Sequence, residues 1–400
     1  MNGITLASTQ VFAEHDLVRD GFLTIDGEGR IARLSDRGGD ADFDLGDVAI
    51  IPGLIDLHIH GREERDVMDA DPAALAVISA SLARHGVTGF LATTVTTSWD
   101  RTLAALQVIG ETDGNALPGA RMLGAYSEGS FFNARHKGAH NTAYFLEPTP
   151  ELIDQMIAAT NGKLKVLALA PEINGAMETL SHATGRGIRV TLGHTDATYD
   201  QARAALAAGG CGGVHVFNGM RGIHHREPGC AGAVLLEPGM VEVIADGVHL
   251  HPGILQLIVR LKQADEVVLI SDCMCAGGLD DGDYRLGEMD VTVKAGVVRT
   301  AGEGSLAGST LTLDRAVMLM AEGAGIALRE AVQMASLAPA RFMGIDHETG
   351  SIAAGKRADL ALRDPTGRIV ATLVGGRLAW LDPEWDRGPA LRAAMGAVSA

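Results

Sequence analysis

The stretch that decides the fold is residues 51–61, which read Ile-Pro-Gly-Leu-Ile-Asp-Leu-His-Ile-His-Gly. This apolar run ends in two histidines one residue apart, His58 and His60. If the run is a β-strand, alternate side chains share a face, so both imidazoles project from the same end and can reach one metal ion. A histidine pair alone is a weak signal, because one surface histidine beside one held by a hydrogen bond is the commoner arrangement.

The size and charge of the chain limit what it can be. Its 400 residues predict one large α/β barrel with an appendage, or two to three domains. A net charge of −17 argues against nucleic acid or an anionic membrane as the main partner. Four cysteines are too few for a disulfide framework, and no apolar run reaches the roughly 20 residues of a membrane span. We therefore expect a soluble cytoplasmic protein.

Beyond residue 51, apolar runs alternate with alanine-rich helical stretches, as in parallel strands joined by crossover helices. We expect helices at residues 71–85, with Asp71 as N-cap and Gly86 as C-cap, and at residues 196–208. Eight strand runs can be counted, at residues 49–60, 89–97, 121–129, 164–172, 188–194, 211–218, 241–251 and 266–272. Eight repeats of strand and helix predict a closed (β/α)8 TIM barrel of class α/β.

The two ends of the chain carry a different pattern. Short strands broken by turns fill the first 50 residues, and the same signature returns at residues 359–376. The two ends are therefore expected to share a sheet, in a small β-sandwich domain of residues 1–52 and 350–400. The barrel is expected to span residues 53–349.

The C-terminal ends of the eight runs carry the chemistry. They hold His58, His60, Thr93, Thr94, Glu128, Glu172, His194, His215, His249 and Asp272. In a (β/α)8 barrel these ends meet at one mouth. Imidazoles and carboxylates together bind zinc, iron or manganese, and a divalent metal that polarises a carbonyl and activates water favours hydrolysis of an amide or ester. Asp272 can take the proton of the attacking water and pass it to the leaving amine, or it can simply cap the following loop.

A second cluster, His224-His225-Arg226, lies in a turn-like stretch that is locally cationic within an acidic protein. The planar guanidinium of Arg226 suits a phosphate or a carboxylate. Taken alone, such a cluster is more often a solvated loop. Its position after the strand that ends at His215 places it near the mouth.

At this point the chain resembles the amidohydrolase superfamily and, within it, the N-acetylglucosamine-6-phosphate deacetylase family. The similarity extends to about Leu381. The matching segments are residues 52–61, 128–129, 137–140, 193–198, 215–220, 226–229, 245–249, 271–272 and 306–312. Departures from the usual pattern fall at Tyr126, Ser130, Gly219 and the run 273–275, and they leave the metal and catalytic groups intact.

The resemblance implies the role of each matching residue. It assigns the principal metal to Glu128, His194 and His215, the second metal of some members to His58 and His60, and substrate contacts to Asn218, Gly219, Gly129, His225 and Leu306. It makes Asp272 the general base and acid and His140 the donor to the acetyl carbonyl oxygen. Arg226 and His249 are implied to bind the phosphate of the site in a neighbouring subunit, which implies a homodimer.

The resemblance also implies the reaction and its metal. The expected activity is deacetylation of a small phosphorylated amino sugar, N-acetyl-D-glucosamine 6-phosphate first and its galactosamine counterpart as the alternative. The expected cofactor is one or two divalent ions per subunit, zinc before iron, manganese or cobalt. Two other hypotheses remain: a cyclic-amide amidohydrolase, which would need a lysine at the end of strand four where this chain has Glu172, and a scaffold without activity.

Overall fold

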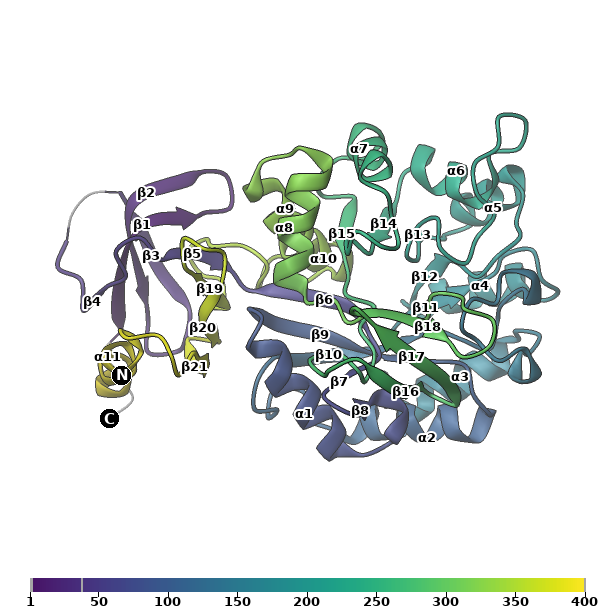
Figure 1. Ribbon diagram of the computed structural model, residues 1–400, viewed down its shortest axis with the longest axis horizontal. Helices are drawn as coiled ribbons and strands as arrows, with labels where there is room; N and C mark the ends of the chain where they lie inside the picture. Colours follow the sequence, from purple (N-terminus) through teal and green to yellow (C-terminus); the bar gives the residue numbers. More distant parts are fainter. Residues whose placement is uncertain (1–2, 37–38, 399–400) are drawn as a thin grey trace.

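In the computed structural model of the chain, which describes residues 3–36 and 39–398, a β/α barrel stands beside a smaller β-rich part (Figure 1). Eight strands form the barrel sheet, and each pairs in parallel with its neighbours. They are β6 (Leu54–Ile59), β9 (Val87–Thr94), β10 (Arg121–Ser127), β11 (Leu164–Leu169), β12 (Arg189–Leu192), β13 (Gly212–Gly213), β14 (Met240–Val243) and β15 (Val267–Leu269). A bridge between Ile59 and Cys273 joins the first strand to the end of the last, so the predicted TIM barrel is confirmed.

Helices fill the crossovers and cover the outside of the barrel. They are α1 (Pro72–Ala83), α2 (Trp99–Glu111), α3 (Pro150–Ala159), α4 (Ala176–Gly185), α5 (Tyr199–Ala207), α6 (Gly229–Leu236) and α7 (Pro252–Leu261), followed by α8 (Leu313–Ala324), α9 (Leu328–Met334) and α10 (Leu337–Met343). The predicted N-cap Asp71 is confirmed, because its carboxylate accepts a hydrogen bond from the amide of Ala73 at 2.9 Å.

Several sequence predictions within the barrel are wrong in their bounds. The helix expected at 71–85 ends at Ala83 with Arg84, not Gly86, as its C-cap, and the strand expected at 241–251 ends at Val243. The helix expected at 196–208 begins only at Tyr199, because Thr198 and Gln201 form a reciprocal capping box. The strand expected at 211–218 is reduced to Gly212–Gly213, since the chain leaves the ladder and turns at His215.

The opening stretch is not one strand but two. Residues Ala49–Pro52 form β5, which pairs with β19 (Leu360–Arg363) in the smaller sheet, and β6 starts two residues after β5 ends. The amide of Gly53 bonds to the carbonyl of Asp359 at 2.8 Å, and the next amide, of Leu54, bonds to Gly86 at 2.9 Å on the barrel side. The chain therefore changes sheets at Gly53, five residues before His58.

The smaller part joins both ends of the chain, as predicted. Its sheet contains β1 (Ile4–Phe12), β2 (Leu17–Ile25), β3 (Ile31–Ser35), β4 (Phe43–Asp44), β5, β19, β20 (Ile369–Val374) and β21 (Arg377–Leu381). Side chains from both arms of the sheet and from α11 (Gly388–Val398) form one hydrophobic core that is separate from the barrel core. The predicted fold class of a TIM barrel with a small β-sandwich domain is confirmed.

An insertion between β15 and α8 was not predicted. It is a three-stranded antiparallel sheet of β16 (Gly282–Leu286), β17 (Met289–Lys294) and β18 (Val297–Thr300), which packs on its own small core. A short ribbon of β7 (Gly61–Arg62) and β8 (Arg65–Asp66) follows the first barrel strand. No helix in the described parts of the chain has the length and apolar content needed to cross a bilayer.

Candidate active site

A cavity of about 340 Å³ opens at the C-terminal ends of the barrel strands. Its wall contains His60, Val95, Glu128, Gly138, Ala139, His140, His194, His215, Asn218, Gly219, Ile244, His249, Asp272, Leu286, Ser305, Leu306 and Gly308. The volume is within the range of small-molecule sites, roughly 300–1,000 Å³. Leu286 reaches the cavity from the insertion, and Ser305, Leu306 and Gly308 reach it from the segment after the insertion, so these parts form one of its sides.

One group of possible metal ligands combines Glu128, His194 and His215, all buried. The Oε1 atom of Glu128 lies 3.2 Å from Nε2 of His194 and 2.9 Å from Nε2 of His215. The two Nε2 atoms are 3.2 Å apart. Three ligand atoms thus converge on one point at the mouth of the barrel.

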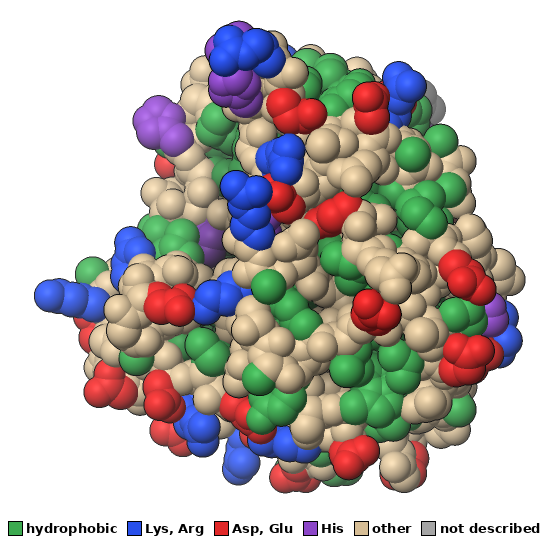
Figure 2. All heavy atoms as spheres, turned by 90° about the vertical axis from the view of Figure 1, so that its right-hand side faces the viewer, with side chains coloured by type: hydrophobic (Ala, Val, Ile, Leu, Met, Phe, Trp, Pro, Cys, Tyr) green, Lys and Arg blue, Asp and Glu red, His purple; other side chains and the backbone are tan. Residues whose placement is uncertain are grey.

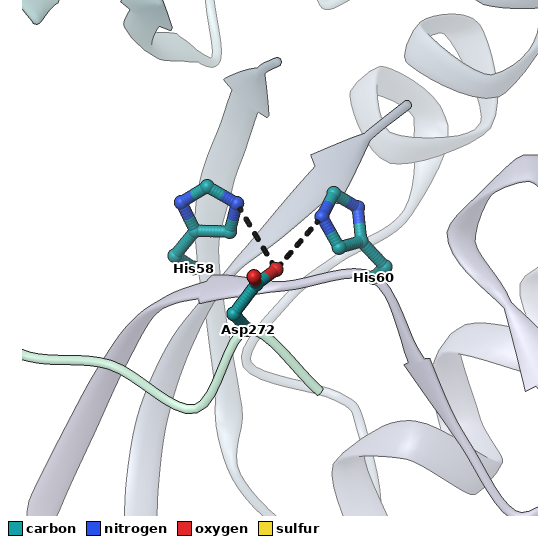
Figure 3. Close-up of side chains that lie close together, drawn as sticks. All are labelled: His58, His60 and Asp272. Carbon is teal, nitrogen blue, oxygen red and sulfur yellow. Dashed lines mark ion pairs between the residues drawn. The ribbon is translucent and has the colours of Figure 1, made fainter. Parts of the chain in front are cut away.

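The second group contains His58, His60 and Asp272, which point toward one another in Figure 3. The Oδ1 atom of Asp272 lies 3.6 Å from Nε2 of His58 and 3.2 Å from Nε2 of His60. Glu128 joins the two groups, because its other oxygen, Oε2, lies 3.5 Å from His58 and 3.2 Å from His60. One carboxylate therefore faces both groups, as a bridging ligand would.

Hydrogen bonds on the far side of each imidazole decide which nitrogen faces the cluster. Nδ1 of His194 contacts the carbonyl of His136 at 2.9 Å, and Nδ1 of His60 contacts the carbonyl of Thr93 at 3.2 Å. Nδ1 of His215 likewise contacts the carbonyl of Asn218 at 3.1 Å. A carbonyl oxygen only accepts, so each Nδ1 carries a proton, and each Nε2, once free of a proton of its own, presents a lone pair to an ion in the cluster.

These lone pairs fit a metal ion. The Nε2 atoms face carboxylate oxygens at 2.9–3.6 Å in both groups, so positive charge, from a metal ion or from protons on Nε2, must lie between them. Nε2 of His58 is fully buried and has no hydrogen-bond partner. Among the described residues neither group includes a cysteine. The donor set of nitrogens and carboxylate oxygens is that of a catalytic centre for zinc or a similar divalent ion.

His140 has the opposite tautomer. Its Nδ1 lies 2.8 Å from the hydroxyl of Thr96 and 3.4 Å from the backbone amide of Thr96, which can only donate. The hydroxyl in turn accepts the amide of Ser130 at 3.1 Å, so its own proton points to His140. Nδ1 is therefore an acceptor, and the proton of the neutral ring sits on Nε2, 3.6 Å from Glu128.

The charges in the cavity follow from burial and contact. Burial lowers the pKa of His140 well below its usual value, and the neighbouring His194 adds to this effect, so His140 is neutral. Burial alone would raise the pKa of Asp272, but the hydrogen bond from His60 and the charge of His58 outweigh it and lower the pKa. Burial would also lower the pKa of His60, but Asp272 and Glu128 raise it to about 9. The site thus attracts positive charge and keeps Asp272 ionised.

Backbone strain is concentrated at the same residues. His194, His215 and Asp272 have φ angles of 47°, 24° and 47°, in the left-handed region that side chains other than glycine rarely adopt. Each stands just after the end of its strand, where the strained turn directs the side chain into the cavity. Such strain persists where the surrounding structure enforces it, and it is typical of functional sites.

Comparison with known proteins agrees with this geometry. Residues 49–379 match the Amidohydrolase family. The chain belongs to the amidohydrolase family. A relative from Vibrio furnissii, an N-acetylglucosamine-6-phosphate deacetylase, is 43% identical over 366 residues, which cover 90% of this chain and 91% of that protein. An N-acetylgalactosamine-6-phosphate deacetylase from Escherichia coli O157:H7 is 44% identical over 331 residues, covering 82% of this chain and 87% of that protein.

Solved structures of the same family share the fold. An Asp-to-Ala variant of N-acetyl-D-glucosamine-6-phosphate deacetylase from Mycobacterium smegmatis, in complex with N-acetyl-D-glucosamine-6-phosphate, superposes with a TM-score of 0.91. It is 33% identical, and the match covers 95% of this chain and 100% of that one. The resemblance to the deacetylase family that the sequence motifs indicated is confirmed.

The structure of this amidohydrolase brings most of the predicted site residues to one cavity. Asn218, Gly219, His249 and Leu306 line it together with the metal-ligand candidates, whereas His58 lies beneath the wall. His249 is thus in the wall of its own chain's cavity, although it was predicted to serve a neighbouring subunit. Its Nδ1 contacts Asp246 at 2.7 Å, which fixes the ring in that wall without a second chain.

Two glycines act through their backbone. Gly129, predicted as a substrate contact, is not in the wall; its φ is +136°, and an added Cβ would lie 2.6 Å from the hydroxyl of Thr96. Gly219 has a φ of +56°, and a Cβ there would lie 2.8 Å from the ring of His194. Glycine at these positions lets the chain approach Thr96 and the ring of His194 closely.

Arg226 and His225 do not reach the cavity of their own chain. Both are exposed, and the Nη1 atom of Arg226 lies 2.6 Å from Nε2 of His225 on the loop before α6. Figure 2 shows histidine and basic side chains gathered on a projection at the top of the face turned to the viewer. A contact between these side chains and a ligand of this cavity is therefore not made within one chain.

Several strand-end residues have supporting roles. Glu172 accepts hydrogen bonds from Thr195, Asp196 and Asn133 at 2.5–2.9 Å and so ties loops of the mouth together, apart from either ligand group. Lys163 at the start of β11 bonds to the carbonyls of Gly110 and Thr112 at 2.8 Å, away from the mouth. The described wall of the cavity contains no lysine, so the feature that a cyclic-amide enzyme would need is missing there.

Sequence reasoning missed Thr96 and Glu242, which contact His140 and His58 respectively. For Glu242 a signal was present, since it is the one charged residue in the otherwise apolar run of residues 240–245. Thr96 gave no signal, because its role depends on the loop that carries His140, some 44 residues away.

Proposed function

We propose that this amidohydrolase hydrolyses the acetamide of an N-acetylhexosamine 6-phosphate, giving the amino sugar phosphate and acetate. The observation that carries the proposal is the pairing of the two ligand groups with His140 and Asp272 in one cavity. N-acetyl-D-glucosamine 6-phosphate is the first substrate to test. N-acetylgalactosamine 6-phosphate is the second, because relatives with each of these names are about equally similar to this chain.

We propose zinc as the divalent ion, with iron, manganese and cobalt as alternatives that the same donor set accepts. Glu128, His194 and His215 would hold the principal ion, and His58, His60 and Asp272 would hold a second one with Glu128 between them. When bound, the metal would polarise the acetyl carbonyl and lower the pKa of water at the site.

Asp272 is proposed to move the proton. Its carboxylate is ionised at neutral pH and lines the cavity, so it can accept a proton from the attacking water and give it to the leaving amine. The Nε2–H of His140 is proposed to donate to the acetyl oxygen as negative charge develops on it. Asn218, Gly219 and Leu306 are proposed to contact the sugar from the wall of the cavity.

The phosphate requires a cation that the cavity lacks. Among the described wall residues there is no lysine or arginine, and the nearby Lys137 is paired with Glu303 at 2.8 Å. We propose that Arg226 of the partner subunit, together with His225 of the partner subunit, supplies the missing charge in a homodimer, while His249 acts within its own chain. A guanidinium suits this task because its donor fork matches a phosphate.

The first experiment measures acetate release from both sugar phosphates by zinc-loaded protein and by Asp272→Asn. The proposal expects release from at least one of them and a loss of about 10²-fold or more in kcat for the variant, since general acid–base groups contribute roughly 10²–10⁴-fold. Absence of release from both substrates would refute the proposed function. Undiminished release by Asp272→Asn would remove Asp272 from the reaction.

A mixing experiment tests the shared site. Arg226→Ala should raise KM for the phosphorylated sugar far more than for the unphosphorylated one, whereas Arg203→Ala, at an exposed position on α5, should change neither. Mixing Arg226→Ala with Asp272→Asn subunits should restore activity, because a mixed dimer contains one site with both residues. No restoration after subunit exchange would refute the contribution of Arg226 across the dimer.

The cysteines bear on two of the remaining expectations. The four cysteines are free thiols in the described structure, in agreement with the expected reducing, cytoplasmic location. Cys273 and Cys275 are buried, and their sulfurs contact Arg62 and the carbonyl of Arg285 rather than a ligand group. We therefore assign both cysteines to packing.

A further inference from the structure

Glu242 is a buried carboxylate that the proposed reaction does not use. It lies on β14, its exposed fraction is 0%, and it is not part of the cavity wall. Its neighbours Val241 and Val243 belong to the hydrophobic core, as expected for residues that alternate along a strand. A charged group in this position is costly unless it is paired or faces a metal centre.

Glu242 contacts one of the proposed metal ligands directly. Its Oε2 lies 3.0 Å from Nδ1 of His58 and 3.4 Å from the backbone amide of His215. Its Oε1 has no hydrogen-bond partner. Because an ionised carboxylate only accepts, Nδ1 of His58 carries a proton, and Nε2 is the nitrogen that faces Glu128 and Asp272 and is available to an ion.

His58 is unusual among the four ligand histidines. The other three donate Nδ1–H to a neutral backbone carbonyl, whereas His58 donates to a carboxylate. A carboxylate behind an imidazole fixes the tautomer more strongly and makes Nε2 a better ligand. The histidine of the first barrel strand, His58, is therefore held by a carboxylate. The two histidines of the principal ligand group are held only by backbone carbonyls.

The charge balance points in the same direction. Glu128, Asp272 and Glu242 are all within 4 Å of His58 and place three negative charges in the interior. One divalent ion carries two positive charges and cannot balance three carboxylates, whereas two ions carry four and exceed the three by one. Since a buried charge without a partner is strongly unfavourable, an interior that keeps Glu242 favours a second bound cation.

We infer that Glu242 is a positioning residue that makes the His58, His60 and Asp272 group a stably occupied second metal site: it holds His58 with Nε2 toward the ion and supplies part of the charge that the ion balances. The inference rests on the proposed metal-dependent function. It specifies a two-ion centre in this chain and names the residue that determines it.

The test compares wild-type protein with Glu242→Gln and with Asp56→Asn. Asp56 is a matched control, because it is also a buried carboxylate in the barrel interior, but it bonds to the amides of His58 and Ser271 and not to an imidazole. Each protein is stripped with a chelator and titrated with Zn²⁺ alone. Zinc equivalents are measured by elemental analysis after removal of free ion, and the melting temperature is measured with and without zinc.

Wild type and Asp56→Asn are expected to hold two zinc ions. Glu242→Gln should retain one tight ion and bind the second about 10–100 times more weakly, the range known for such supporting groups. Without metal, Glu242→Gln should melt no lower than wild type, because it no longer buries a charge, whereas a purely structural glutamate would lower the metal-free melting temperature. The stabilisation of Glu242→Gln by zinc should be smaller than that of wild type.

Two tight zinc ions in Glu242→Gln, or only one in wild type, would overturn the inference. If Glu242→Gln does not fold, the wild-type protein still provides a test, because ¹⁵N spectra of labelled histidine report the tautomer. A signal for His58, assigned by its loss in His58→Asn, that shows no proton on Nδ1 in metal-free protein would overturn the inference. Lack of acetate release with two ions bound would count against the proposed function and leave the role of Glu242 standing.

Discussion

The hydroxyl of Thr96 provides a test of how His140 is prepared to donate. Thr96→Val keeps the shape of the side chain but removes the hydroxyl that lies 2.8 Å from Nδ1 of His140. Only the backbone amide of Thr96, at 3.4 Å, then remains to hold Nδ1 as an acceptor. The ring is free to move its proton to Nδ1, and in that tautomer Nε2 cannot donate to the acetyl oxygen.

The size of the effect follows from the contacts that are lost. One buried neutral hydrogen bond contributes a net of about 0.5–1.5 kcal/mol, and 1.4 kcal/mol is about tenfold in a population or a rate. We therefore expect Thr96→Val to lower kcat by about 3- to 10-fold. His140→Ala removes the donor itself and should cost about 10²–10³-fold. The amide of Ser130 also loses its acceptor in Thr96→Val, at a stability cost of about 1–3 kcal/mol.

The assay is steady-state acetate release by zinc-loaded protein, with zinc content measured in the same samples. Thr96→Ser is the matched control, because it restores the hydroxyl and should recover at least half of the wild-type kcat. Zinc content should not change in Thr96→Val, since His140 belongs to neither ligand group. A kcat within twofold of wild type for Thr96→Val, or equal losses for the valine and serine variants, would refute the tautomer argument.

Three further predictions concern the metal and the loops of the mouth. Asp196→Asn should lower the melting temperature at neutral pH by about 2 °C, near 1 kcal/mol, because Arg221 and Arg135 bond to its partly exposed carboxylate at 2.9 Å. Since those contacts hold the pKa of Asp196 well below its usual 3.8, the difference from wild type should be constant above pH 3.8 and shrink as the pH falls below it; a difference that shrank between pH 7 and 5 would contradict this assignment. The double variant His58→Asn with His60→Asn should halve the zinc content in elemental analysis, and an unchanged content would mean that these two histidines hold no ion. Removing metal with a chelator should lower the melting temperature of wild type, and adding zinc should restore it. A melting temperature that zinc does not change would exclude a tightly bound ion.

The sequence predicted the fold and many polar residues of the cavity wall, because both depend on parallel strands. Once the runs ending in His58, Glu128, His194 and Asp272 are taken as strands of one parallel barrel, their ends must meet, whatever the exact bounds of each strand. This is why the convergence could be expected although the strand at 211–218 proved to be two residues long. The deviation there serves the site, since the early turn at His215 directs its imidazole toward Glu128.

Other features depend on contacts that no local pattern records. The tautomer of His140 is decided by Thr96, on a different strand end. The insertion of residues 282–300, through Leu286, and the segment after it form one side of the cavity without any motif that predicts where they pack. Glu242 lies in the middle of a strand, so a search for functional residues at the ends of strands does not find it. Supporting residues are therefore harder to predict than ligands, because their function arises only when the barrel is closed.

The division of the opening stretch between two sheets explains why the smaller part of the molecule matters for the metal centre. Pro52 pairs with Leu360 in the smaller sheet, and the amide of Gly53 is held by Asp359, so the start of β6 is anchored outside the barrel. Along a strand, a displacement at Gly53 is transmitted to His58 with little loss, because five residues in extended conformation have few ways to absorb it. Asp359 is itself fixed, since its carboxylate accepts the hydroxyl of Thr349 at 2.8 Å and the amide of Gly375 at 2.7 Å. Segments from the two ends of the chain thus hold the start of β6 in place. The position of β6 along its own direction then determines where the two histidines lie relative to Glu128.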